Sequence, residues 1–148
     1  MKKFALAVLL TISSQTFACP DLTGTYMVSS SDTLYVTQGR DESGITVYNF
    51  TTKNAFCRAC EHRSIYRADG RTTTREFADR IRVEHRKISC DGDKLLIRQT
   101  AETFDRGRRV AAFTDHYDYS LNSRSGLVEE EIKDGQVYRT TTHYRLAP

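Results

Sequence analysis

The stretch Leu34–Phe50, LYVTQGRDESGITVYNF, has the pattern of two strands around a polar turn. Residues 34–38 and 45–50 alternate apolar and polar side chains and are rich in β-branched and aromatic types, which is typical of half-buried strands. Between them, residues 39–44 contain two glycines and two acidic residues and have the composition of a turn. We therefore expect an antiparallel hairpin here.

The same pattern continues over most of the remaining chain. Asp-Gly pairs at 69–70, 91–92 and 134–135 separate β-like runs, and Asp-Gly readily adopts the positive φ of tight hairpin turns. No window shows a convincing 3.6-residue apolar period, and only residues 74–82 could form a helical turn. The sequence predicts an all-β fold, an antiparallel up-and-down meander of about eight to ten strands. The expected strands are 23–30, 33–38, 45–52, 62–68, 71–77, 80–90, 94–104, 109–121, 126–133 and 136–146.

Two late strands carry aromatic side chains at alternate positions, which places them on one face of each strand. These side chains are Phe113, Tyr117 and Tyr119 in the first strand and Tyr138 and Tyr144 in the second. Closing the meander on itself would remove its exposed edges, so we expect a small closed barrel lined by tyrosine and threonine. The five aromatic residues are the candidate ligand-binding face, and the alternative is that they only fill a narrow barrel.

The N-terminus has the anatomy of a secretory signal peptide. Residues 1–18 comprise two lysines, an apolar run that is too short to span a bilayer, and a small residue at Ala18. We expect one domain, residues 19–148, in the periplasm or outside the cell.

Cys19 directly follows the leader, so it is also a candidate lipid anchor. Bacterial lipidation favours a leucine-like residue three positions before the cysteine, and Thr16 and Phe17 do not fit that pattern. We therefore favour ordinary cleavage after Ala18, with an outer-membrane lipoprotein as the alternative.

The chain has four cysteines: Cys19, Cys57, Cys60 and Cys90. An even count in an exported chain favours two disulfides, and the sequence leaves all three pairings open. A redox-active C-x-x-C would need an activated thiol at a helix N-terminus, which is not predicted. A zinc site from Cys57, Cys60, His62 and Cys90 is the other alternative, but thiols in an oxidising compartment tend to be oxidised. We expect no metal and no cofactor.

Charge and spacing argue against several functions. The net charge of +3 falls to about +1 without Lys2 and Lys3, so nucleic acid is not an expected partner. No set of base, nucleophile and metal ligands converges, and we expect a non-enzymatic protein.

In the acidic run 129–131, Glu129 and Glu131 share a strand face and Glu130 points away. We expect this run to face arginines across the sheet.

Three short motifs resemble those of the calycins, the group of up-and-down barrels that includes the lipocalins. Gly24-Thr25-Tyr26 stands where lipocalins carry Gly-x-Trp in the first strand, and residues 114–119, TDHYDY, resemble their Thr-Asp-Tyr motif. The resemblance implies that a late arginine, Arg139 or Arg145, packs across the first-strand aromatic side chain. Tyrosine replaces tryptophan here, the Thr-Asp element has an extra residue, and the chain is too short for the usual C-terminal helix.

Two functions are compatible with these expectations. The first is an exported barrel that binds a small apolar or mixed ligand in or at the mouth of the barrel. The alternative is an envelope interaction protein or inhibitor whose outer surface binds a protein partner.

Overall fold

The part of the chain that the structure describes forms a single antiparallel sheet of ten strands. The computed structural model describes residues 18–77 and 81–147, and the predicted leader, residues 1–18, lies outside this part except for Ala18. No helix in this part is long and apolar enough to cross a membrane. The strands are β1 (Gly24–Met27), β2 (Asp32–Arg40), β3 (Thr46–Asn54), β4 (Cys57–Arg67), β5 (Thr72–Phe77), β6 (Arg82–Asp91), β7 (Lys94–Asp105), β8 (Arg108–Asn122), β9 (Gly126–Lys133) and β10 (Gln136–Arg145).

These strands confirm the predicted all-β meander. The opening stretch of sequence forms the β2–β3 hairpin, in which Val36 lies opposite Phe50 and Asp41 accepts the turn hydrogen bonds of Ser43 and Ile45. A helical turn was the alternative over residues 74–82. Residues 74–77 of this stretch belong to strand β5 and Arg82 begins β6, whereas residues 78–80 lie outside the described residues. Local alternation and turn composition were sufficient here because neighbouring strands pair through short turns.

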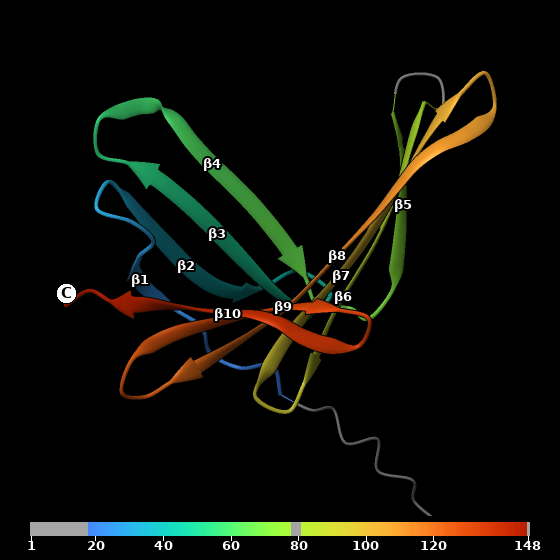
Figure 1. Ribbon diagram of the computed structural model, residues 1–148. Coiled ribbons are helices and arrows are strands. Elements are labelled where there is room, and N and C mark those ends of the chain that lie inside the picture. Colours follow the sequence, from blue (N-terminus) through green and yellow to red (C-terminus); the bar gives the residue numbers. More distant parts are fainter. Residues whose placement is uncertain (1–17, 78–80, 148) are drawn as a thin grey trace, which may run out of the picture.

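The first and last strands pair with each other, β1 with β10, so the sheet order is β4-β3-β2-β1-β10-β9-β8-β7-β6-β5. Its two free edges are therefore β4 and β5, which are consecutive in the sequence. Figure 1 shows β4 and the upper ends of β5–β8 diverging from a common corner. In the described residues no ladder pairs β4 with β5, and the sheet is not closed into a barrel by hydrogen bonds. Barrel closure is therefore not confirmed.

The corner between β4 and β5 explains this opening. Gly70 has the expected positive φ of 70°, but the predicted hairpin at Asp69–Gly70 is wrong. The Ala68 amide donates to the Thr46 carbonyl on β3, whereas the Gly70 amide donates to the Ile88 carbonyl on β6. Because the corner is bound to a different strand on each side, β5 continues along β6 and leaves the edge of β4 free.

The core lies on the concave face, at the end of the sheet where the chain enters. It comprises Leu22, Tyr26, Leu34, Val36, Tyr48, Phe50, Ile88, Leu95, Ile97, Tyr119 and Leu127. The entering segment crosses this end and buries Leu22 completely. The Tyr48 hydroxyl donates to the Pro20 carbonyl at 2.6 Å, and the Tyr26 hydroxyl donates to the Leu22 carbonyl at 2.8 Å. The two buried hydroxyl groups thus provide hydrogen-bond donors for the carbonyl groups of Pro20 and Leu22, which belong to no strand.

All four cysteines form disulfides, as predicted. Cys19 pairs with Cys90 across 71 residues, and Cys57 pairs with Cys60 within β4. The first bond joins the entering segment to the end of β6. No group of three or more metal-ligating side chains occurs in the described part of the chain. The two bonds are compatible with an oxidising location, periplasmic or extracellular.

Candidate functional site

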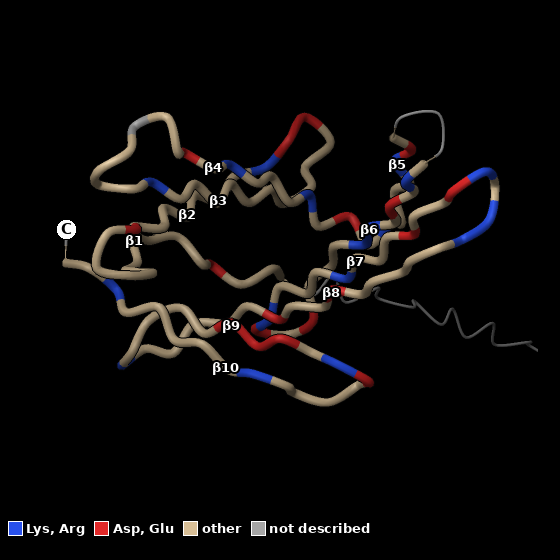
Figure 2. Tube along the Cα trace, turned by 45° about the horizontal axis from the view of Figure 1, so that its top comes forward, with Lys and Arg blue, Asp and Glu red and all other residues tan. Residues whose placement is uncertain are grey.

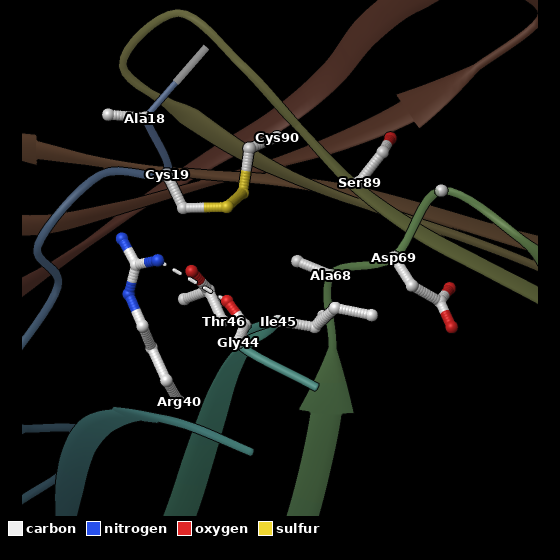
Figure 3. Close-up of a pocket in the computed structure, with 11 residues that line it drawn as sticks. Ala18, Cys19, Arg40, Gly44, Ile45, Thr46, Ala68, Asp69, Ser89 and Cys90 are labelled. Atoms are coloured by element: carbon white, nitrogen blue, oxygen red, sulfur yellow. Dashed lines mark hydrogen bonds between the residues drawn. A yellow bond between two sulfur atoms is a disulfide. The ribbon is translucent and has the colours of Figure 1, made fainter. Parts of the chain in front are cut away.

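Several hollows lie in the described part of the chain, and one of the larger ones is at the disulfide end. It has a volume of about 490 Å³ and lies beside the Cys19–Cys90 bond, as Figure 3 shows. Its two charged side chains are already engaged: Arg40 donates to the Gly44 carbonyl at 3.3 Å, and Asp69 is bound to Arg67. The other lining groups offer few side-chain hydrogen bonds, so this pocket has little with which to orient a ligand.

Another hollow, which we call the recess, has convergent polar groups and a volume of about 220 Å³. Its polar lining side chains are Thr52, His62, Ser64, Tyr119, Glu129 and His143. The remaining wall is formed by Val28, Leu34, Phe50 and Tyr66. These residues come from six strands, β2, β3, β4, β8, β9 and β10, and from the β1–β2 turn. The recess therefore exists only because the sheet curves over itself.

The carboxylate of Glu129 is the centre of the recess. The Tyr119 hydroxyl donates to Glu129 Oε2 at 2.9 Å, and His143 Nε2 lies 3.5 Å from the same oxygen. Tyr119 and His143 are 8% and 7% exposed, respectively, whereas the Glu129 side chain is 21% exposed, so the carboxylate is half-buried between two buried side chains. Cross-strand register places them together: Glu129 lies directly opposite Tyr119 on β8 and Thr141 on β10.

The environment of Glu129 favours its ionised form. Burial by itself raises the pKa of Glu129, but the hydrogen bonds from His143 and Tyr119 outweigh it, and the pKa lies below its usual value. Burial raises the pKa of Tyr119, and the neighbouring Glu129 charge raises it further. The pair is therefore a carboxylate and a neutral phenol at neutral pH.

Aromatic rings form the wall next to this carboxylate. The Phe50 ring lies 5.2 Å from the Tyr66 ring at 89° and 5.1 Å from the Tyr119 ring at 80°. Both are edge-to-face pairs, which fix the ring orientations. On the β4 side of the recess, Ser64 Oγ lies within 3.3 Å of His62 Nε2. The recess thus combines aromatic surface, hydrogen-bonding groups and one half-buried carboxylate.

The five predicted aromatic residues do not gather at this site. Tyr119 lines it, and the Tyr117 ring lies 6.4 Å from the Tyr119 ring in the next row. Phe113 lies farther along β8, where its ring lies below the Arg82 guanidinium at 5.1 Å. Only one of the predicted residues therefore lines the recess.

The prediction that Tyr138 and Tyr144 face the interior is wrong. They are 65% and 58% exposed, and β10 instead turns His143 inward, opposite the fully buried Leu127. Alternation separates the two faces of a strand but does not say which face is covered. In β10 that choice is made by the pairing with β1 and β9.

The sequence predicted the strand face of Glu129 but not its partners. The expectation that Glu130 points away from Glu129 and Glu131 is confirmed, because Glu130 binds Lys94 at 2.7 Å on the other side of the sheet. Glu131 is paired with Arg139 at 3.1 Å, as expected for an acidic strand that faces arginines. Glu129 differs because its partners are a phenol and an imidazole, which only the register could reveal.

Comparison with known proteins finds no matching family model, no similar curated protein and no similar solved structure.

Proposed function

We propose that this chain is an exported, non-enzymatic binding protein that holds a small ligand in the recess. The single observation that carries this proposal is the half-buried Glu129 carboxylate beside the Phe50, Tyr66 and Tyr119 rings. A concave, largely aromatic surface with a few oriented polar groups is the usual form of a small-molecule site.

Two further observations support export and a lipocalin-like arrangement. Both disulfides fit an oxidising compartment, in agreement with the predicted signal peptide. Of the two candidate arginines, Arg145 lies over the first-strand aromatic side chain, with its Cζ 5.8 Å from the Tyr26 ring centroid. We therefore propose a short lipocalin-like domain that is open between β4 and β5 and binds its ligand on the concave face.

A test of ligand binding uses protein purified from its own envelope and examined by native mass spectrometry. Ser64→Phe would fill the recess from β4, because Ser64 lines it. Arg63→Phe is the matched control, because Arg63 is the next residue and points to the opposite face. We expect a retained small molecule on the parent chain and on the control, but not on Ser64→Phe. Equal retention by both variants, or no adduct on any chain, would contradict the proposal.

A protein partner bound at the arm is the second candidate function. The arm is the part of β5–β8, with its turns, that extends beyond the β8–β9 ladder, residues 73–77, 81–86 and 99–115. Ile81 and Val110 on it are 54% and 58% exposed. Figure 2 shows basic residues at the turn between β7 and β8, where Arg106 adopts a positive φ of 47°. This surface suits an acidic protein partner with an apolar contact.

Site-specific photo-crosslinking in the native host would test the arm. A photoreactive residue at Val110 is expected to capture one discrete protein partner. The same residue at Val137 on β10, which is 52% exposed, serves as the control. Equal crosslinking at both positions would contradict the arm as an interface.

A further inference from the structure

We propose that the ligand of the recess is a small organic cation, an aromatic amine held by Glu129. This inference rests on the proposed function, because it names the chemical class that the same recess would bind. Four features support it: the unused oxygen of Glu129, the surrounding aromatic rings, the ion pairs of the neighbouring carboxylates and the volume of the recess.

Glu129 has one carboxylate oxygen left for a ligand. Both of its side-chain contacts in the described part of the chain, from Tyr119 and His143, involve Oε2. In that part of the chain Oε1 has no hydrogen-bond partner. Because it is not one of the fully buried atoms without a partner, it retains some exposure to solvent. An ammonium group that donates to Oε1 would form a charge-assisted hydrogen bond, which is stronger than a neutral one.

The aromatic side chains next to Glu129 also favour a cation. Phe50 packs nearly perpendicular to both Tyr66 and Tyr119, so rings border the recess in more than one orientation. The face of an aromatic ring carries negative charge and attracts a cation, more strongly where water is excluded. A carboxylate and ring faces together are therefore complementary to an ammonium group, and both would repel a carboxylate ligand.

The local charge distinguishes Glu129 from its neighbours. Glu131 lies on the same face of β9 but is paired with Lys133 and Arg139, both at 3.1 Å. Glu130, on the other face, is paired with Lys94. In the residues that the structure describes, no lysine or arginine comes within ion-pair distance of Glu129. A ligand cation would therefore add a partner at Oε1, beside the His143 contact at Oε2.

The volume limits the size of the ligand. At about 220 Å³, the recess is smaller than the roughly 300 to 1,000 Å³ of sites for drug-sized molecules. It suits a single aromatic ring with a short amine arm. His62 and Ser64 lie on the β4 side, where they can hydrogen-bond to a polar substituent of the ring.

Three probes of the same shape and different charge test this class: phenethylamine, 2-phenylethanol and phenylacetate. Their affinities for the disulfide-bonded parent chain are measured by protein NMR titration. We expect phenethylamine to bind at least about tenfold more tightly than 2-phenylethanol, and phenylacetate to bind most weakly. If 2-phenylethanol or phenylacetate binds as tightly as the amine, the cation class is overturned while binding in the recess stands. If none of the three binds, the proposed function fails as well.

Variants then assign the effect to one carboxylate. Glu129→Gln keeps an oxygen that can accept from Tyr119 but removes the charge, so the affinity for phenethylamine should fall about tenfold. Its affinity for 2-phenylethanol should stay within about twofold. Glu130→Gln is the matched control, because its carboxylate lies on the opposite face with Lys94. Equal losses in both variants would contradict the assignment, and the parent-chain comparison remains decisive if Glu129→Gln does not fold.

Discussion

Arg145, in the last strand, lies over the ring of Tyr26, in the first, with 5.8 Å between the guanidinium carbon and the ring centroid. The same guanidinium donates to the Thr23 carbonyl at 2.5 Å, so it holds the entering segment as well as β1. The contact reinforces the pairing of Tyr26 with Arg145 that joins the two ends of the meander. It follows that this end of the sheet depends on a planar cation and not on charge alone.

Replacing Arg145 with lysine should destabilise the chain by about 1 kcal/mol. Lysine keeps the positive charge but cannot stack as a plane and donate to Thr23 at the same time. Urea denaturation followed by circular dichroism measures the difference. Arg139→Lys is the control, because its exposed pair with Glu131 needs only a positive charge, and its cost should stay below about 0.5 kcal/mol. Equal losses would show that Arg145 acts only as a charge.

The two disulfides should differ in their contribution to stability. A cross-link stabilises mainly by restricting the unfolded chain, and this effect grows with the length of the closed loop. Cys19–Cys90 closes 71 residues of separation and Cys57–Cys60 only three. Replacing each pair with serine should cost about 4 kcal/mol for the first and about 2 kcal/mol for the second. Urea midpoints of the two double variants measure this order, and the reverse order would contradict it.

Gly126 should not tolerate alanine. Its φ is +119°, and an added Cβ would lie 2.4 Å from the His143 carbonyl oxygen and 2.8 Å from the Arg145 amide nitrogen. Both atoms belong to the backbone of β10, so the strand itself would have to move. We expect Gly126→Ala to lower the free energy of unfolding by at least about 2 kcal/mol.

Gly39→Ala is the comparison for Gly126→Ala. An added Cβ at Gly39 meets nothing within 4 Å, and the effect should stay within about 0.5 kcal/mol. Thermal denaturation of both variants tests the pair, and similar midpoints would show that β10 can move aside.

Stability should fall steeply at alkaline pH. Burial raises the pKa of Tyr26, Tyr48 and Tyr119 in the folded chain. A tyrosine with a raised pKa stabilises the fold fully below its unfolded pKa of about 10, and this stabilisation is lost as pH rises from there toward the folded pKa. Each such tyrosine should therefore lower the free energy of unfolding by about 1.4 kcal/mol per pH unit above about pH 10.

Tyr48→Phe separates this effect from hydrogen bonding. At neutral pH it should cost about 1 kcal/mol, because the bond to the Pro20 carbonyl is lost. Above about pH 10 the variant has one fewer buried phenol, so its stability should fall less steeply than that of the parent. Urea denaturation over the alkaline range measures both slopes, and parallel slopes would contradict a raised pKa at Tyr48.

The sequence by itself determined the strands, because alternation and turn composition are local. The β2–β3 hairpin and the Asp134–Gly135 turn were predictable from a few consecutive residues. The number of disulfides also followed from composition and the predicted export. The partner of Cys19 did not, since any of three cysteines could approach the entering segment.

The tertiary structure alone decided which strand faces are buried and where the sheet opens. The inward orientation of His143 depends on the pairing of β10 with β1, which are at opposite ends of the chain. The opening at β4 and β5 depends on hydrogen bonds from Ala68 and Gly70 to two different strands. The position of Glu129 beside Tyr119 depends on register and on the curvature of the sheet. These relationships join residues far apart in sequence, so no local pattern specifies them, and the candidate site is built from them.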